Sequence, residues 1–376
     1  MAGIYIHIPF CKQACFYCDF HFSTSLKKKE EMLVSLVREI KLRKEELKGA
    51  IIETIYFGGG TPSVLSTEEI RGLIAAVYLN FEVIENPEIT LEANPDDLSE
   101  EKLIALSKSP INRLSIGVQS FFEKDLKLMN RAHNAAEAKK SLALATRYFD
   151  NISLDLIYGI PGCTNEEWRT NIKTALSFGI PHISSYALVV EPYTALKTMI
   201  EKGKIKNVDD TKTQQQFQIL TKELATAGFI HYELSSFGKE GFFGKNNSAY
   251  WFGVAYLGIG PSAHSFDGKQ RSWNVKNNVK YIKAIQENAL LIERETLSLT
   301  DRYNEFVMTG LRTMWGVSLD KIKDKFGEKY LNYLEKHSKK HIEEALLFVE
   351  NGTLKTRKKG WFLVDGIAAD LFMLNE

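Results

Sequence analysis

The first half of the chain alternates short, apolar, β-branched runs with longer amphipathic stretches. A short apolar run bounded by turn residues is typical of a buried strand, and apolar residues three and four positions apart indicate a helix. The pattern predicts six strands, at residues 4–8, 54–57, 89–92, 113–118, 152–157 and 183–189. Around them it predicts helices at residues 27–48, 67–81, 99–107, 122–148 with a break at 132–134, and 165–178.

Strands that are separated by helices form a parallel sheet covered on both faces, either an open doubly wound sheet or a barrel. The periodicity fits both arrangements. Polar or glycine-rich positions recur at the strand ends, at Cys11–Cys18, Gly58–Gly60, Glu92, Gln119 and Asp155. Because loops at the carboxyl edge of parallel strands gather ligand-binding groups, we expect these positions to form one shared site.

The second half of the chain has a different pattern. A helix and a strand are predicted over 209–237, and the glycine and asparagine residues of 238–268 predict irregular loops. Charged helical segments are predicted at 301–314, 318–326 and 328–351, and a short hairpin at 354–364 around Lys358–Gly360. We therefore expect a core over 1–237, a loop-rich connecting region over 238–296, and a small, mainly helical, winged-helix-like domain over 297–376.

Composition and charge narrow the class of protein. The 376 residues include 48 Lys and Arg against 47 Asp and Glu, so no global field attracts nucleic acid or anionic lipid. No apolar run approaches the roughly 18 residues that a membrane span needs. The N-terminus lacks a basic segment followed by an apolar stretch. We expect a protein of two or three domains, located in the cytoplasm, without a membrane span.

Three of the four cysteines, Cys11, Cys15 and Cys18, lie within eight residues directly after the first predicted strand. A structural zinc site normally has four Cys or His ligands, and Cys163 or His21 could complete one. Reduced core cysteines are a second alternative. Three closely spaced thiolates without an obvious fourth ligand better suit an iron–sulfur cubane with one open iron, which can bind a substrate or cofactor.

The spacing Cys-x3-Cys-x2-Cys, with Tyr17 before the last cysteine, resembles the radical S-adenosylmethionine (SAM) superfamily. In that family three cysteines bind a [4Fe–4S] cluster, SAM occupies the fourth iron, and the fold is a partial (β/α)6 barrel. The strings Tyr5-Ile-His-Ile-Pro-Phe-Cys11 and Gly58-Gly-Gly-Thr-Pro62 are similar to the oxygen-independent coproporphyrinogen III oxidase group. This group has an oxidase branch, the HemN type, and a haem chaperone branch, the HemW type.

The resemblance implies a set of SAM-contacting residues, and the residues themselves suggest why. Gly58–Gly60 would let backbone approach a ligand closely, or would form a tight turn. Glu92 and Asp155 are carboxylates in otherwise apolar strands, where burial requires a partner. Gln119 and Arg131, taken alone, could equally lie on the surface. The implied set is Tyr5, Tyr17, Gly59, Gly60, Thr61, Glu92, Gln119, Arg131, Asp155 and Ala187.

Two departures separate this chain from the oxidase branch. The oxidase pattern has a further cysteine two residues beyond the cluster, where this chain has Phe20, and an extension before the residue matching Tyr5. The resemblance is therefore closer to the chaperone branch, which implies binding of haem and its transfer to an acceptor protein that the sequence does not identify. Catalysis is not expected in that case, and no catalytic residue is assigned. The alternative is a radical SAM oxidase or decarboxylase acting on coproporphyrinogen III or a related porphyrin.

The chaperone branch carries a His-Asn-x-x-Tyr-Trp motif tied to haem binding. The matching residues are Asn246, Asn247, Tyr250 and Trp251, so an amide stands where the family has its histidine. An amide nitrogen is a poor iron ligand compared with imidazole. His264 or Tyr250 could ligate the iron instead, although His264 could be a packed loop residue, and Tyr250 and Trp251 could fill the core.

One basic run, Lys355-Thr-Arg-Lys-Lys359, lies on the presumed wing. Winged helices often bind DNA, which makes a redox-sensing DNA-binding protein a third hypothesis. A short basic run without a paired basic recognition helix is typical of a solvated turn. A nucleic-acid partner is therefore not expected.

Overall fold

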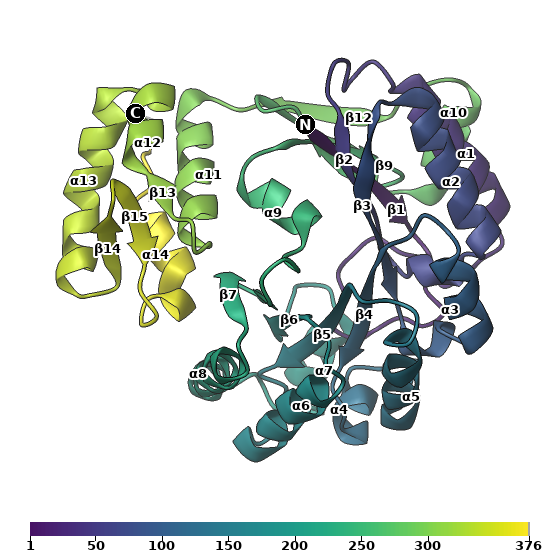
Figure 1. Ribbon diagram of the computed structural model, residues 1–376, viewed down its shortest axis with the longest axis horizontal. Coiled ribbons are helices and arrows are strands. Elements are labelled where there is room, and N and C mark those ends of the chain that lie inside the picture. Colours follow the sequence, from purple (N-terminus) through teal and green to yellow (C-terminus); the bar gives the residue numbers. More distant parts are fainter. Residues whose placement is uncertain (375–376) are drawn as a thin grey trace.

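The computed structural model describes residues 1–374. It contains one 12-stranded sheet, in the order β12-β11-β10-β9-β1-β2-β3-β4-β5-β6-β8-β7, and one three-stranded sheet. Figure 1 shows the large sheet with its helices around the outside, and the smaller C-terminal domain beside it. Each part has its own hydrophobic core.

Six parallel strands in chain order form the centre of the large sheet, as the periodicity predicts. Because β1 and β6 pair with other strands and not with each other, the barrel is partial, and the predicted α/β class is confirmed. The strands are β1 (Ala2–Ile8), β2 (Ile52–Gly59), β3 (Val83–Ala93), β4 (Arg113–Gln119), β5 (Ile152–Tyr158) and β6 (His182–Ala187). The helices that connect and follow them are α1 (Lys29–Leu42), α2 (Thr67–Asn80), α3 (Glu100–Ser107), α4 (Glu123–Leu128), α5 (Ala135–Ala145), α6 (Asn165–Ser177), α7 (Ala195–Glu201) and α8 (Asp210–Thr226).

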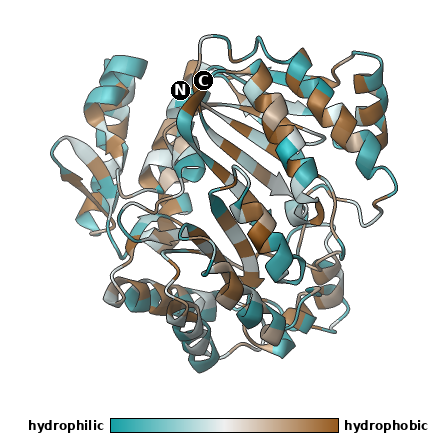
Figure 2. Cartoon of the chain, turned by 45° about the vertical axis from the view of Figure 1, so that its right-hand side comes forward, coloured by the Kyte–Doolittle hydropathy of each residue, from teal (hydrophilic) through white to brown (hydrophobic). Residues whose placement is uncertain are grey.

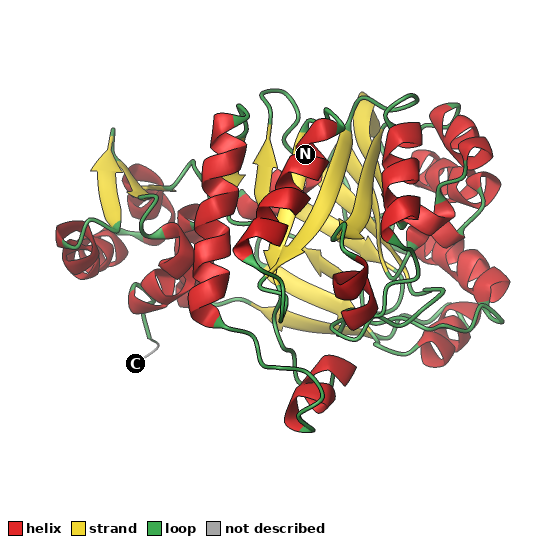
Figure 3. Ribbon diagram, turned by 90° about the horizontal axis from the view of Figure 1, so that it is seen from below, coloured by secondary structure: helices red, strands yellow, loops and turns green. Residues whose placement is uncertain are grey.

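The two faces of each barrel strand differ in chemistry. On β1, Ile4, Ile6 and Ile8 are fully buried in the hydrophobic core, whereas Tyr5 and His7 point the other way, into the barrel. The same alternation places the Asp155 side chain inside, because successive strand residues face opposite sides. Figure 2 shows hydrophobic positions on the strands and hydrophilic ones on the outer helices, and Figure 3 shows helices flanking the sheet. The polar positions of the strands thus line the barrel interior.

The break predicted within 122–148 is real, since α5 starts from its own capping box at Asn134. The helix predicted over 27–48 ends earlier, at Leu42. The following Arg-Lys-Glu-Glu-Leu-Lys stretch has too few apolar positions to continue a buried face, and it forms turns.

The prediction of irregular loops over 238–268 was wrong. This segment contains α9 (Lys245–Trp251), β9 (Ala255–Ile259) and β10 (His264–Phe266). Glycines that look like turn signals are needed here for close packing, because a Cβ on Gly258 would lie 2.0 Å from the His264 carbonyl oxygen. Together with β11 (Gln270–Asn274) and β12 (Ile292–Thr296), β9 and β10 form one edge of the large sheet, which we term the edge extension. Helix α10 (Asn278–Gln286) connects β11 to β12. At the opposite edge, β8 (Ser236–Gly238) and β7 (Ile230–Glu233) add two more strands.

The C-terminal domain has three helices where the sequence predicts them, α11 (Leu299–Leu311), α12 (Leu319–Phe326) and α13 (Glu328–Glu343), followed by α14 (Val364–Asp370). The helix predicted over 328–351 is shorter than expected, because residues 347–350 form a strand. The predicted hairpin position was wrong. The hairpin joins β14 (Leu347–Glu350) to β15 (Thr353–Thr356) through Asn351-Gly352, both with positive φ, the signature of a tight two-residue turn; β13 (Val317–Ser318) completes the sheet. Within residues 1–374, no helix is long and apolar enough to span a membrane.

The basic run of this domain is engaged within the domain itself. Lys355 pairs with Glu350 at 2.9 Å, and the Arg357 guanidinium lies 4.8 Å from the Phe348 ring centre. Lys359 donates to the Glu344 carbonyl oxygen. These contacts fit the prediction of a solvated turn better than a nucleic-acid surface.

Candidate functional site

A cavity of about 420 Å³ opens at the carboxyl end of the barrel strands, where the sequence predicts a shared site. The loop after β1 and the ends of β2 to β6 form its wall. Of the residues predicted to bind the cluster or SAM, all but Tyr5 line it: Cys11, Cys15, Tyr17, Cys18, Gly59, Gly60, Thr61, Glu92, Gln119, Arg131, Asp155 and Ala187.

The end of β2 holds the start of the cysteine loop in place. The amide of Gly60 donates to the Ile8 carbonyl, and the amide of Thr61 donates to the Phe10 carbonyl. The Thr61 hydroxyl also donates to the Cys11 sulfur at 3.4 Å. A side chain at Gly60 would collide with this backbone, since its Cβ would lie 2.6 Å from the Phe10 oxygen. The glycine run therefore permits a close approach between the strand and the loop.

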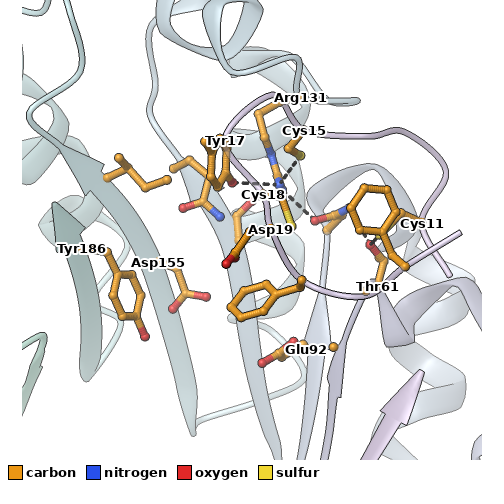
Figure 4. Close-up of a pocket in the computed structure, with 18 of the residues that line it drawn as sticks. Cys11, Cys15, Tyr17, Cys18, Asp19, Thr61, Glu92, Arg131, Asp155 and Tyr186 are labelled. Carbon is orange, nitrogen blue, oxygen red and sulfur yellow. Dashed lines mark hydrogen bonds between the residues drawn. The ribbon is translucent and has the colours of Figure 1, made fainter. Parts of the chain in front are cut away.

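Arg131 connects the cysteine loop to the barrel. Its Nη1 donates to the Cys15 sulfur at 3.3 Å, and its Nη2 donates to Asn94 Oδ1 and to the Gly117 carbonyl (Figure 4). Burial opposes the guanidinium charge, but Tyr17 and Cys15 outweigh this effect and raise the Arg131 pKa above its ordinary value. A permanent positive charge therefore lies beside the Cys15 sulfur. Burial raises the pKa of Cys11, and the Arg131 charge partly offsets that effect.

The chemistry of the three thiols fits the predicted iron–sulfur group. Burial, with the neighbouring Cys15 and Cys11, raises the Cys18 pKa to about 11, so metal binding there would release protons. All three cysteines are free and border the same cavity. In the described chain, no three Cys, His, Asp or Glu side chains converge closely enough to hold a single metal ion.

Two carboxylates lie on the side of the cavity away from Cys15 and Arg131 (Figure 4). Burial raises the pKa of Glu92 to about 7 and that of Asp155 to about 6, and each carboxylate has hydroxyl partners. The Tyr56 hydroxyl donates to Glu92 at 2.8 Å, and Ser115 donates to Asp155 at 3.2 Å. A cationic ligand in the cavity would stabilise both charged forms.

Tyr5 lies outside the cavity wall. Its ring stacks on Tyr56 at 6.0 Å, and its hydroxyl lies 3.3 Å from His7 Nδ1. It supports Tyr56, which in turn contacts Glu92, so its contact with the site is indirect.

Sequence reasoning missed several wall residues. Strand alternation could have found Ser115 and Gly117, which share the inward face of β4. The segment after the last cysteine and the end of β6 have no comparable signal. The missed residues from these parts include Asp19, Phe20, Phe22, Tyr186, Leu188, Val189 and Glu191.

The residues matched to the haem motif do not line the cavity. Asn246 is buried: its side-chain oxygen accepts from Thr54, and its backbone N–H donates to Glu88. Asn247 follows it on α9. Since Thr54 lies near the start of β2, Asn246 is at the end of the barrel opposite the cysteines.

The aromatic residues of the motif are packed against neighbouring elements. Tyr250 meets the Tyr256 ring edge-on at 4.6 Å, and the Arg312 guanidinium lies 5.8 Å from the Trp251 ring centre. His264 is on β10 and is exposed. It is therefore not the packed loop histidine considered as an alternative.

Comparison with known proteins assigns the class. Residues 5–175 match the Radical SAM superfamily, and residues 297–363 match the HemN C-terminal domain. The structure is similar to that of coproporphyrinogen III oxidase (HemN) from Escherichia coli, with a TM-score of 0.86 and 22% identity over 99% of this chain and 90% of that one. This likeness establishes a shared fold, that of radical SAM proteins with a small C-terminal domain.

Curated relatives narrow the class further. The heme chaperone HemW of Lactococcus lactis is 33% identical, over 99% of this chain and 97% of its own length. That of Bacillus subtilis is 36% identical, over 88% and 87% respectively. The chain belongs to the HemW family of radical SAM proteins, as its motifs indicate.

Proposed function

We propose that this protein is a haem chaperone, which binds haem and passes it to an acceptor protein in the cytoplasm. The relatives named heme chaperones support this over nearly the whole chain. The observation that carries the proposal against the oxidase alternative is the side chain at position 20. Phe20 lines the cavity and is 68% exposed, at the position where the oxidase pattern has its additional cysteine.

The cavity residues fit a SAM-ligated [4Fe–4S] cluster. Cys11, Cys15 and Cys18 would supply the three thiolates, and Arg131 would offset their negative charge. Glu92 and Asp155 would accept hydrogen bonds from the polar part of SAM, with Gly59 to Thr61, Tyr17, Gln119 and Ala187 completing the wall. When bound, such a cluster supplies electron transfer to SAM.

The exposed Phe20 gives the cavity an apolar edge instead of an acid–base or thiol group. A thiol can donate a hydrogen atom or ligate iron, whereas a phenyl ring can do neither and offers a stacking surface. Because position 20 carries no thiol, decarboxylation of a porphyrinogen is the weaker proposal.

The test is an anaerobic assay of reconstituted protein with SAM and coproporphyrinogen III, followed by haem titration of the same sample. We expect haem binding at micromolar concentration and no protoporphyrinogen. Product formation would establish the oxidase instead. A sample with an intact cluster that neither decarboxylates nor binds haem would contradict both proposals.

A further inference from the structure

The edge extension presents two different faces. Its outer face packs beneath α1, where Ser265 accepts a hydrogen bond from the buried Arg43 guanidinium. Its inner face continues the interior side of the barrel, since Tyr256 pairs with Gly3 of β1, on the same side as Tyr5. We call the residues of this second side the inner face: Tyr256, His264, Phe266, Arg271 and Trp273.

His264 is the chemically distinctive member of the inner face. It is directly opposite Trp273 across the β10–β11 pair, and the two rings stack at 5.8 Å with an interplanar angle of 29°. Neither ring nitrogen of His264 makes a hydrogen bond within residues 1–374, and the side chain is exposed. Partial burial, and then the charge of Arg271, lower its pKa, so the imidazole is neutral at pH 7 with a free lone pair.

The neighbours of His264 combine flat apolar surface with positive charge. Tyr256 and Phe266 are cross-strand partners whose rings lie 6.3 Å apart, and Tyr250 of α9 meets Tyr256 edge-on. The Arg271 guanidinium lies 5.8 Å from the Phe266 ring centre and pairs with Glu305 of α11 at 2.9 Å. Figure 1 shows α9 between the barrel strands and the C-terminal domain.

An accessible neutral imidazole beside aromatic rings, with a guanidinium nearby, matches the chemistry of haem: an iron that takes a nitrogen ligand, a flat apolar ring, and carboxylate side chains. We infer that haem binds on the inner face, with His264 as the axial iron ligand, Trp273 and Tyr256 against the macrocycle, and Arg271 near a propionate. The inference rests on the proposed haem chaperone function and locates its site.

Asn246 cannot take the axial role in this fold. Its amide oxygen is held by the Thr54 hydroxyl at 3.1 Å, and a Cβ on the adjacent Gly3 would lie 3.5 Å from that oxygen. The residue is 4% exposed, so an iron ligand there would require displacement of α9. In this chain the imidazole for haem is thus on strand β10 and not on helix α9.

The test uses the full-length protein with its cluster and SAM, titrated with ferric haem. We expect His264→Ala to raise the dissociation constant at least tenfold and to remove the imidazole-ligated signature from the electron paramagnetic resonance spectrum. Free imidazole should restore that signature. The control is His337→Ala, because His337 is also stacked on an aromatic ring, Tyr333 at 4.0 Å, but lies in the C-terminal domain; it should bind haem as the unaltered protein does.

A ligand-side measurement keeps the inference testable if His264→Ala folds poorly. The unaltered protein should bind haem more tightly than haem dimethyl ester, and Arg271→Gln should remove that preference while leaving the axial signature unchanged. Unchanged affinity and axial signature in folded His264→Ala, or equal affinity of the unaltered protein for the two porphyrins, would overturn this site. Failure of the unaltered protein to bind haem at all would instead overturn the proposed function.

Discussion

Replacing Gly60 with alanine tests whether close backbone approach holds the cysteine loop. The new Cβ would lie 2.6 Å from the Phe10 oxygen and 2.9 Å from both the Ile8 oxygen and the Phe10 nitrogen. All three are backbone atoms, which cannot rotate away as a flexible side chain can. The hydrogen bond from Gly60 to Ile8, 2.9 Å long, lies in the same contact and would lengthen.

Forcing an extra carbon into a packed site costs about 1–3 kcal/mol. We expect Gly60→Ala to lose that amount of unfolding free energy in urea, and to hold less iron per chain after reconstitution because the Cys11 loop shifts. The matched control is Gly72→Ala: a Cβ at Gly72, inside α2, meets no heavy atom within 4 Å. That change should stabilise the protein by about 0.5–1 kcal/mol, since alanine is the better helix residue.

Unfolding midpoints and iron content together decide the outcome. If Gly60→Ala matches the unaltered protein in both, the loop does not depend on this contact and the reasoning is refuted. A loss of stability with full iron content would show that the contact supports the barrel but not the cluster site.

Three further predictions concern separate parts of the chain. Cys11→Ser should abolish stoichiometric iron, whereas Cys163→Ser, which changes a buried thiol away from the cavity, should retain it; equal iron in both would refute the ligand assignment. The folded-state pKa of Glu92, about 7, lies above its ordinary value of 4.5, so the protonated side chain stabilises the folded protein. This contribution is complete below pH 4.5 and is lost as the pH rises through 7. The melting temperature of cluster-free Glu92→Gln should accordingly depend less on pH across this window than that of the cluster-free unaltered protein. The same pH dependence in both proteins would contradict the raised pKa of Glu92. Glu39→Ala should destabilise the protein by about 3–5 kcal/mol in denaturant, because it removes the fully buried one of the two carboxylates paired with Arg43 and leaves the buried Tyr281 hydroxyl without its acceptor. Glu45→Ala, at an exposed pair, should have little effect.

The sequence could predict the six strands and their helices because these signals are local, whereas the choice of a partial barrel over an open sheet came from the family resemblance. Each of the six strands is a short apolar run, and several helices have recognisable caps, such as the capping box of Ser66 and Glu69 before α2. The cysteine spacing likewise stays within eight residues. These patterns depend on contacts inside one element or between neighbouring ones, so they can be read without knowing the fold.

The edge extension could not be predicted in this way. Gly258 and Gly260 look like loop residues, but a side chain at either position would collide with another part of the backbone. A Cβ on Gly258 would meet the His264 carbonyl oxygen, and a Cβ on Gly260 would lie 2.7 Å from the His7 carbonyl oxygen. The partner of Gly260 is some 250 positions away along the chain. No local pattern distinguishes a glycine required by such a contact from one required by a turn.

Contacts between distant parts of the chain also decide the roles of His264 and Asn246, and the local sequence does not show them. A linear motif places Asn246 where a ligand is expected and says nothing of Thr54 and Glu88, which occupy its polar atoms. His264 lies outside that motif, and only the pairing of β10 with β11 shows that it is accessible and adjacent to Trp273. Whether a side chain can bind iron depends on which of its atoms are already engaged, and this is a property of the folded chain. An asparagine at the motif position therefore need not abolish haem binding, provided that the fold presents another imidazole on the same side of the sheet.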